Sequence, residues 1–425
     1  MALNGNMTII HASQLITCGG KTAKKGRVMN DLGIIEDGAV RVEDGVIRAV
    51  GTTREVTGEF TASDETFDAS GRIVLPGFVD PHTHFVFAGY RPEEFLMRTR
   101  GTPYMEIMAK GGGILNTVAA TRRASREELF QSAVERLDAM LAYGVTTVEG
   151  KSGYGLDRDT EIKQLTVMRS VNDSHPMDVV STFLGAHAFP REYSGDKGAY
   201  LDFLIDRVLP EVHEKKLAEF CDVFCEKNVY SIDQSRRLLA RAMRLGLGLK
   251  IHADEMVPLG GAELAAELGA VSADHLLAAS DNGIKRMAEK NVVATLLPAT
   301  AFCLKEPYAR ARFMIDQGCA VALATDFNPG SSFTHSLPLV ISLAVIYMGM
   351  SIEETITALT LNGAAAVNRE SVVGSIDVGK WGDMVVMDCP SYPFLAYHTG
   401  VNQVHATIKK GNLVWQAQKG ICYPT

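Results

Sequence analysis

The chain has 425 residues, of which 46% are hydrophobic, enough to build one large core and a smaller one. Its formal net charge is −8 and it carries no stripe of basic residues interleaved with aromatic ones, which argues against a nucleic-acid-binding protein. It contains neither a run of eighteen apolar residues nor the pattern of a signal peptide, so we expect no membrane span and no secretion.

Residues 1 to about 75 are predicted to form short strands joined by turns. Apolar segments such as MTIIHASQLIT and AVRVEDGVIRAVG alternate there with glycines and Asp-Gly pairs. From about residue 76, short apolar runs alternate with amphipathic helical stretches such as SREELFQSAVERLDAMLAYG, the pattern of βα units. After about residue 365 the pattern of strands and turns returns in GSIDVGKWGDMVVMD and HATIKKGNLVWQAQ.

The middle of the chain contains eight apolar runs, each followed by helical sequence, over roughly 290 residues, which is close to the usual size of a (β/α)₈ barrel. In chain order the runs are RIVLPGFVDPHTH, VTTVEGKSGYG, VVSTFLGAHA, CDVFCEKN, LGLKIHADE, AVSADHL, VVATLLPAT and CAVALATDFNP. The sequence therefore predicts an α/β protein with a (β/α)₈ TIM barrel over residues 76–364. The two ends, residues 1–75 and 365–425, are predicted to pair into one small composite β-sandwich domain.

Polar residues gather at the ends of these predicted strands. His82 and His84 end the first run, and their spacing of two residues turns both to the same side of a strand. The carboxyl ends of barrel strands form the functional face of this fold. The residues that we expect to meet there are His82, His84, His252, Glu255, His275, Asp326 and Asn328.

This set of residues predicts one divalent metal ion per chain, because imidazole and carboxylate groups suit both zinc and iron. The expected ligands are His82, His84, His252 and Asp326. A bound metal lowers the pKa of a ligated water from about 16 to about 7, which favours hydrolysis of a C–N bond. The expected groups for proton transfer are Glu255, His275 and Asp326, and the spacing does not choose among them.

The stretches LPGFVDPHTH, HADE and TDFNP resemble the amidohydrolase superfamily of metal-dependent hydrolases. Within it, KSGYG, PLGGAELA and TDFNPGSS are similar to the imidazolonepropionase family, and the resemblance covers essentially the whole chain. It implies the hydrolysis of 4-imidazolone-5-propanoate to N-formimidoyl-L-glutamate in histidine degradation. Zinc and ferrous or ferric iron all remain open as the metal.

The resemblance also implies a set of substrate contacts. Arg91 is the expected clamp for the propionate group, because a guanidinium binds a carboxylate with two hydrogen bonds. The other expected contacts are Tyr154, His187, Glu255, Asn328, Gly330 and Ser331. Lys227 ends the fourth run, where binuclear relatives carry a carbamylated lysine, whereas the family resembled here is mononuclear. Gly150 and Ala299 are unusual for that family, since a branched apolar residue and a glycine are expected at the two positions.

Two other functions stay open at this point. A deaminase of the same superfamily would use the same metal ligands, but a neutral base would not need Arg91. A catalytically inactive barrel serving as a scaffold would be expected to have lost metal ligands, whereas every expected position is occupied here. An assay for ammonia release distinguishes a deaminase from the expected hydrolase. The metal content of the purified protein distinguishes an inactive scaffold from an enzyme.

The seven cysteines are scattered and odd in number, which suits free thiols in a reducing cytoplasm. Cys221 and Cys225 lie four apart in an apolar run, and we expect buried strand cysteines there rather than a metal site. The expected partner is a small molecule, with neither nucleic acid nor membrane involved. A homodimer is plausible for a cytosolic barrel of this size.

Overall fold

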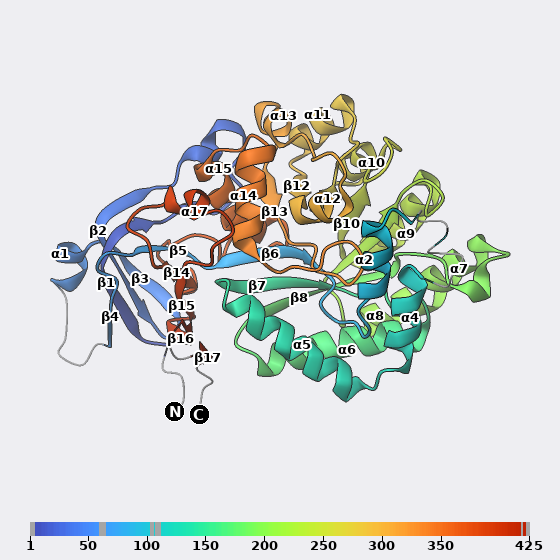
Figure 1. Ribbon diagram of the computed structural model, residues 1–425, viewed down its shortest axis with the longest axis horizontal. Coiled ribbons are helices and arrows are strands. Elements are labelled where there is room, and N and C mark those ends of the chain that lie inside the picture. The colour runs from blue at the N-terminus through green and yellow to red at the C-terminus, as the bar shows by residue number, and fades with distance from the viewer. Residues whose placement is uncertain (1–4, 59–64, 103–105, 107–111, 418–419, 422–425) are drawn as a thin grey trace.

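The computed structural model describes residues 5–58, 65–102, 106, 112–417 and 420–421. Within this part of the chain the strands form two sheets (Figure 1). One sheet belongs to the middle of the chain, and the other combines strands from both ends, drawn blue and red at the left of the figure. This division confirms the predicted fold class.

Eight strands in the described residues form a parallel sheet in chain order that closes into a barrel. The closing contacts join the first strand to the segment after the last one: Asp326 N donates to His82 O at 3.0 Å, and His84 N donates to Phe327 O at 2.9 Å. Each of the eight predicted runs supplies one of these strands. They are β6 (Phe78–Thr83), β7 (Val145–Lys151), β8 (Asp178–Ala186), β9 (Phe220–Cys225), β10 (Gly248–Ala253), β11 (Ser272–His275), β12 (Val293–Leu296) and β13 (Val321–Leu323).

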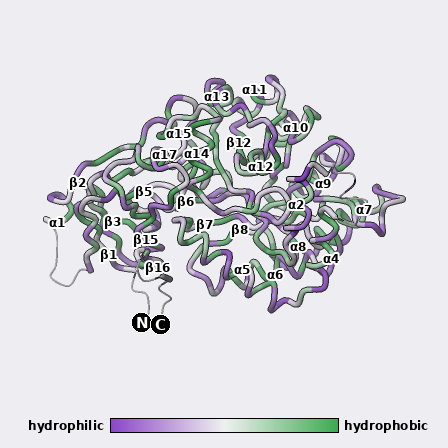
Figure 2. The backbone as a smooth tube through the Cα atoms, viewed as in Figure 1, coloured by the Kyte–Doolittle hydropathy of each residue, from purple (hydrophilic) through white to green (hydrophobic). Residues whose placement is uncertain are grey.

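Helices cover the outside of the barrel, and in Figure 2 their tubes alternate between hydrophobic and hydrophilic colours, as expected for amphipathic helices packed on a sheet. The helix over Arg126–Leu141 begins where Ser125 and Glu128 form a capping box. The α-helices between β6 and the terminal sheet, within the described residues, are α2 (Pro92–Thr99), α4 (Ile114–Arg123), α5 (Arg126–Leu141), α6 (Arg158–Ser174), α7 (Lys197–Phe203), α8 (Leu209–Glu214), α9 (Ile232–Arg244), α10 (Gly261–Leu268), α11 (Asp281–Lys290), α12 (Pro298–Leu304), α13 (Ala311–Asp316), α14 (Leu337–Tyr347), α15 (Ile352–Leu359) and α16 (Leu361–Ala365); α17 (Phe394–Tyr397) lies among the C-terminal strands.

The second sheet contains nine strands in the described residues, in the order β17-β16-β15-β14-β5-β1-β2-β3, with β4 paired to β1. The antiparallel pairing of β14 with β5 joins the two ends of the chain. The sheet packs on a hydrophobic core of its own, which includes Ile9, Leu15, Val40, Val386 and Ile408. Its strands are β1 (Met7–Ile16), β2 (Ile34–Glu43), β3 (Val46–Thr52), β4 (Thr66–Asp68), β5 (Ile73–Pro76), β14 (Met384–Met387), β15 (Val404–Lys409), β16 (Asn412–Gln416) and β17 (Gly420–Ile421).

The first predicted run, RIVLPGFVDPHTH, contains a strand of each sheet. Gly77 separates β5 from β6, and a Cβ atom at this position would lie 2.4 Å from the Thr146 side chain. Lys409 on β15 contacts both Asp383 and Asp178 at the start of β8, which ties the terminal sheet to the barrel. The domain boundaries at 75/76 and 364/365 stay a prediction.

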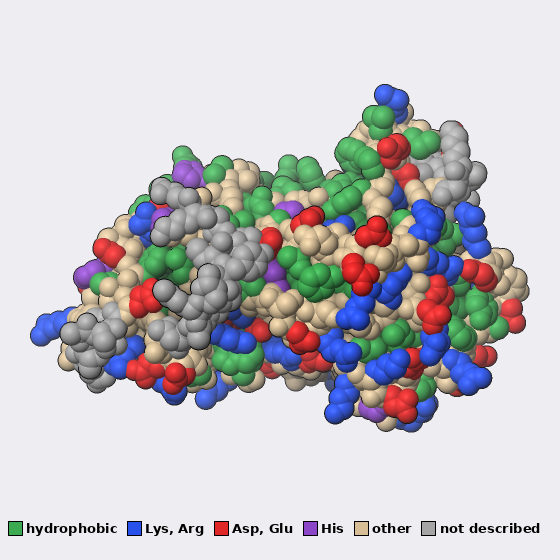
Figure 3. Space-filling model, turned by 90° about the horizontal axis from the view of Figure 1, so that it is seen from below, with side chains coloured by type: hydrophobic (Ala, Val, Ile, Leu, Met, Phe, Trp, Pro, Cys, Tyr) green, Lys and Arg blue, Asp and Glu red, His purple; other side chains and the backbone are tan. Residues whose placement is uncertain are grey.

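Two features of composition have structural counterparts. Cys221 and Cys225 are buried in β9, and the six cysteines within the described residues are free. On the face seen in Figure 3, Lys and Arg side chains are intermixed with Asp and Glu rather than gathered into a patch of one sign. No helix among the described residues is long and apolar enough to cross a membrane.

Candidate metal and active site

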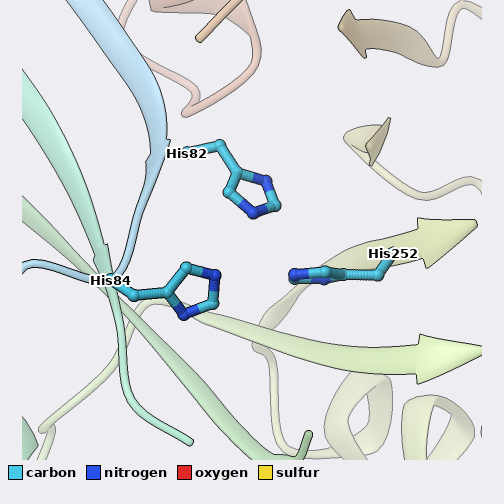
Figure 4. Close-up of side chains that lie close together, drawn as sticks. All are labelled: His82, His84 and His252. Atoms are coloured by element: carbon cyan, nitrogen blue, oxygen red, sulfur yellow. The ribbon is translucent and has the colours of Figure 1, made fainter. Parts of the chain in front are cut away.

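Three histidines converge at the carboxyl ends of the barrel strands (Figure 4). His82 lies near the end of β6, His84 directly follows that strand, and His252 lies near the end of β10. One ring nitrogen of each lies within 4.8 Å of the others, and all three side chains are buried. Residues from opposite sides of the closed barrel thus face a common point.

The carboxylate of Asp326 joins this cluster from the loop after β13. Its Oδ1 atom lies 3.5 Å from Nε2 of His82 and 3.5 Å from Nε2 of His84. Its Oδ2 atom accepts a hydrogen bond of 2.6 Å from Thr300 Oγ1, which fixes the orientation of the carboxylate. Asp326 has a φ of +52°, a conformation that is unfavourable for a non-glycine residue and is often found at functional sites.

The donor set fits a divalent metal ion. Nε2 of His82, Nδ1 of His84 and Nε2 of His252 are buried without a hydrogen-bond partner, whereas Nδ1 of His252 lies 3.0 Å from Asp222 Oδ2. Burial lowers the pKa of His82 and of His84 well below the ordinary value, so both rings are neutral and have a free lone pair. Unpaired buried polar atoms are rare and unfavourable, and a metal ion bound by these nitrogens would satisfy them.

Glu255 and His275 lie beside the histidine cluster. Oε1 of Glu255 is 3.7 Å from Nδ1 of His275, and the His275 ring lies 5.1 Å from that of His252 and 5.4 Å from that of His82, measured between centroids. Burial, followed by the charge of Asp326, raises the pKa of Glu255 to about 8. Burial also lowers the pKa of His275 well below its ordinary value. A carboxyl group that titrates near neutral pH is suited to proton transfer.

Tyr154 and His187 line the other side of the cluster. The His187 ring stacks on that of His84 at 5.1 Å, and Tyr154 lies 5.4 Å from His187. Burial lowers the pKa of His187 to about 3. The KSGYG loop that carries Tyr154 is held by Glu161, whose carboxylate accepts from three backbone N–H groups, and by Gln164, which accepts from Tyr154 N.

Arg91 reaches the loop after β13, where its Nε donates to Pro329 O at 3.4 Å. A Cβ atom built on Gly330 would lie 1.7 Å from Nη2 of Arg91, so the guanidinium occupies the space that a larger residue would fill. Asn328 uses its side-chain amide within this loop: Oδ1 accepts from the backbone N of Gly330 and Ser331, and Nδ2 donates to Asp326 O. The structure thus gives Asn328 a role in shaping the loop.

Three other residues singled out in the sequence lie as follows. Lys227 is exposed, whereas the three clustered histidines are buried. A Cβ atom at Gly150 would lie 2.5 Å from the ring of Phe85, which explains why the expected branched residue is absent. Ala299 is buried in α12, next to Thr300.

Sequence reasoning missed a layer of charged residues inside the barrel, directly below the histidines. Its members are fully buried and lie on β7, β9, β10 and β11: Glu149, Lys151, Asp222, Lys250 and Asp274. It also missed Thr300, the partner of Asp326. The signal that was available is a charged residue within an apolar strand, as in VEGK and LKIHA, because such a residue needs a buried partner.

Comparisons with known proteins agree with this geometry. A model of the Amidohydrolase family matches residues 96–415. Over 413 residues the chain is 59% identical to an imidazolonepropionase of Clostridium tetani, covering 97% of this chain and 99% of the relative. Over 411 residues it is 58% identical to an imidazolonepropionase of Parabacteroides distasonis, covering 96% and 99%.

Solved structures support the fold at much lower identity. An adenosine deaminase from Xanthomonas campestris with bound zinc superposes with a TM-score of 0.74 at 19% identity, covering 99% of this chain and 95% of the other. Guanine deaminase of E. coli does so with a TM-score of 0.69 at 15% identity, covering 97% and 99%. Because the likeness to the imidazolonepropionases extends over nearly the full length of both chains, this chain belongs to the imidazolonepropionase family of the amidohydrolase superfamily.

Proposed function

We propose that the chain hydrolyses 4-imidazolone-5-propanoate to N-formimidoyl-L-glutamate, a step of histidine degradation. The observation that carries the proposal is the 59% identity to an imidazolonepropionase over nearly the whole length, together with three buried histidines that meet at the barrel mouth. In the reaction the oxygen of water bonds to the ring carbonyl carbon, the C–N bond breaks, and a proton passes to the ring nitrogen.

The metal ligands in this proposal are His82, His84, His252 and Asp326, with zinc or iron as the ion. Their unpaired nitrogens and the nearby carboxylate support the assignment. When bound, the ion would supply an activated water near neutral pH. Thr300 holds one oxygen of Asp326, leaving the other turned toward the two histidines.

Glu255 and His275 are proposed to move the proton, with Asp326 as the third candidate. The carboxyl group of Glu255, with its pKa raised to about 8, can accept a proton from water and return it to the leaving nitrogen. The His275 ring faces that carboxyl group and stays neutral, so it can hold a hydrogen bond without adding charge. The His275 side chain is buried and that of Glu255 is 16% exposed, so little bulk water reaches the two groups.

Arg91 is proposed to bind the propionate carboxylate, with Tyr154 and His187 beside the ring. The guanidinium is about nine-tenths buried and lies between the loop at Pro329 and Glu94, whose Oε2 is 3.8 Å away. Binding contacts of Glu255, Asn328, Gly330 and Ser331 are also proposed; Asn328 donates to Ser331 Oγ at 2.9 Å in the loop that Arg91 contacts.

Arg91→Ala should raise KM for imidazolone propionate by about 10- to 100-fold with a smaller change in kcat. Hydrogen bonds between charged groups contribute about 1.5–3 kcal/mol, and each 1.4 kcal/mol corresponds to a factor of about ten. Removing a contact that substrate and transition state share alters KM rather than kcat. Steady-state kinetics of the purified variant would measure both constants.

Gly330→Ala tests the same contact while the arginine is retained. The added methyl group would displace the guanidinium, so KM should rise in the same direction. Gly195→Ala is the matched control, because a Cβ atom there meets nothing within 4 Å. An unchanged KM in Arg91→Ala would contradict the clamp assignment.

The function itself is tested by following the ultraviolet absorbance of freshly made imidazolone propionate with enzyme of known metal content. We expect rapid loss of absorbance, formation of N-formimidoyl-L-glutamate without ammonia, and a rate proportional to about one metal ion per chain. Normal metal content without turnover would contradict the substrate. Ammonia release from a nucleobase would then identify a deaminase.

Two further proposals concern the setting of the enzyme. We place it in the cytoplasm, where a reducing environment would keep the six described cysteines free. A homodimer is proposed as the assembly, and sedimentation of the purified protein would test it.

A further inference from the structure

The barrel contains a layer of five charged side chains beneath the histidines, and none of them belongs to the proposed ligand or substrate set. Each has an exposed fraction of 0%: Glu149, Lys151, Asp222, Lys250 and Asp274. A lysine is almost never fully buried without a compensating partner, because desolvation of the ammonium is strongly unfavourable. Two such lysines in one layer therefore call for a structural or functional reason.

Lys151 contacts three carboxylates at once. Its Nζ lies 2.9 Å from Glu149 Oε1, 2.8 Å from Asp222 Oδ2 and 3.4 Å from Asp274 Oδ2. A protonated lysine has three N–H donors, so each can point to one carboxylate. Burial alone would lower the pKa of Lys151, but the charges of Asp222, Glu149 and Asp274 together raise it, and the side chain is an ammonium.

The two aspartate oxygens that face Lys151 also face the proposed metal ligands. Asp274 Oδ2 lies 2.7 Å from Nδ1 of His82, and Asp222 Oδ2 lies 3.0 Å from Nδ1 of His252. In both histidines this leaves Nε2 without a partner. One ammonium is thus shared by two carboxylate–histidine pairs, and the two histidines lie on β6 and β10, across the barrel from each other.

Lys250 is buried in the same layer but makes different contacts. Its Nζ lies 2.7 Å from Glu149 Oε2 and donates to the carbonyls of Pro81 and Ala366 at 3.0 and 3.2 Å. It is 4.0 Å from Asp274 Oδ2, beyond a hydrogen bond. Its donors therefore connect β10 with β6, with β7 and with the residue after α16. Unlike Lys151, it makes no hydrogen bond to the Asp222 or Asp274 oxygen that faces a histidine.

We propose that Lys151 is a positioning residue of the metal site, whose single ammonium fixes Asp222 and Asp274 so that they orient His252 and His82. This inference rests on the proposed metal site. A carboxylate that accepts the second ring N–H of a ligating histidine fixes both its tautomer and its orientation. Without the ammonium, the two aspartates would be neighbouring buried anions that repel each other, and at least one would turn away from its histidine.

The test compares Lys151→Met with Lys250→Met, a matched removal of a buried lysine from the same layer. Both should lower the melting temperature of the metal-free protein. Competition of zinc with a chelator should show a Kd for the metal that is about 10- to 100-fold weaker in Lys151→Met, the size expected when the support of a ligand is lost. Lys250→Met should stay within about threefold of the unsubstituted protein.

The visible spectrum of the cobalt-loaded protein gives a second readout, since it reports on ligand geometry and not on turnover. It should change in Lys151→Met and stay the same in Lys250→Met. If Lys151→Met does not fold, Lys151→Gln keeps two N–H donors and should show a smaller change in the same direction. Equal metal affinity in the two lysine variants would overturn the positioning role of Lys151 but leave the proposed metal site standing. An unsubstituted protein that binds no metal would overturn both.

Discussion

His252→Ala should lower kcat/KM by about three orders of magnitude or more and remove most of the bound metal. The variant loses one of the three histidines whose ring nitrogens could hold a metal ion together. A catalytic metal supplies several kcal/mol of transition-state stabilisation, and each 1.4 kcal/mol corresponds to a factor of about ten in rate. Metal analysis of the purified protein, together with steady-state kinetics, would measure both effects.

The matched control for this variant is His175→Ala. His175 is also buried, but its Nε2 lies 3.1 Å from Asp138 Oδ1, and it follows α6 at the opposite end of β8 from the site. Its loss should reduce stability while metal content and activity per folded molecule are retained. Full metal content in His252→Ala would contradict the ligand assignment.

The fold could be predicted from the sequence because its signals are local. Each barrel strand is a short apolar run bounded by turn residues, and the helices between them carry caps such as Ser125 with Glu128. The spacing of His82 and His84 placed both on one face of a strand, and the strand-end rule then placed His252 and Asp326 near them.

The layer of buried charges could not be predicted in the same way, because its partners are distant in sequence. Lys151 and Asp222 are 71 positions apart, and Lys250 and Glu149 are 101 apart. Sequence alone suggests that each charge needs a partner, but only the closed barrel determines which partner it finds.

The role of Asn328 was hidden for a different reason. Its amide group faces its own loop, where it accepts from two backbone N–H groups, and this depends on the turn that the loop adopts. Asn, Asp and Ser side chains often bind nearby backbone in this manner. A polar residue beside a site motif is therefore weaker evidence for substrate binding than a polar residue whose donors are left free.

Glu255→Gln should lower kcat by about 100- to 10,000-fold while metal content stays near that of the unsubstituted protein, because positioned proton transfer contributes about this much. Glutamine preserves the shape of the side chain but has no proton that it can exchange. The pKa of about 8, raised first by burial, indicates a carboxyl group that can both accept and release a proton near neutral pH. Glu255 is not one of the proposed metal ligands, which are the three clustered histidines and Asp326. The metal should therefore stay bound in this variant.

Kinetics and metal analysis of Glu255→Gln would be measured beside Glu263→Gln, whose carboxylate accepts from Ser280 on the outer helices. A kcat within about tenfold of the unsubstituted value would contradict the assignment of Glu255. His275 or Asp326 would then be the residue that transfers the proton. Of these two, Asp326 is the more constrained, because Thr300 occupies one of its oxygens and the other faces His82 and His84. His275 has a ring nitrogen without a partner, so it would be the next residue to substitute.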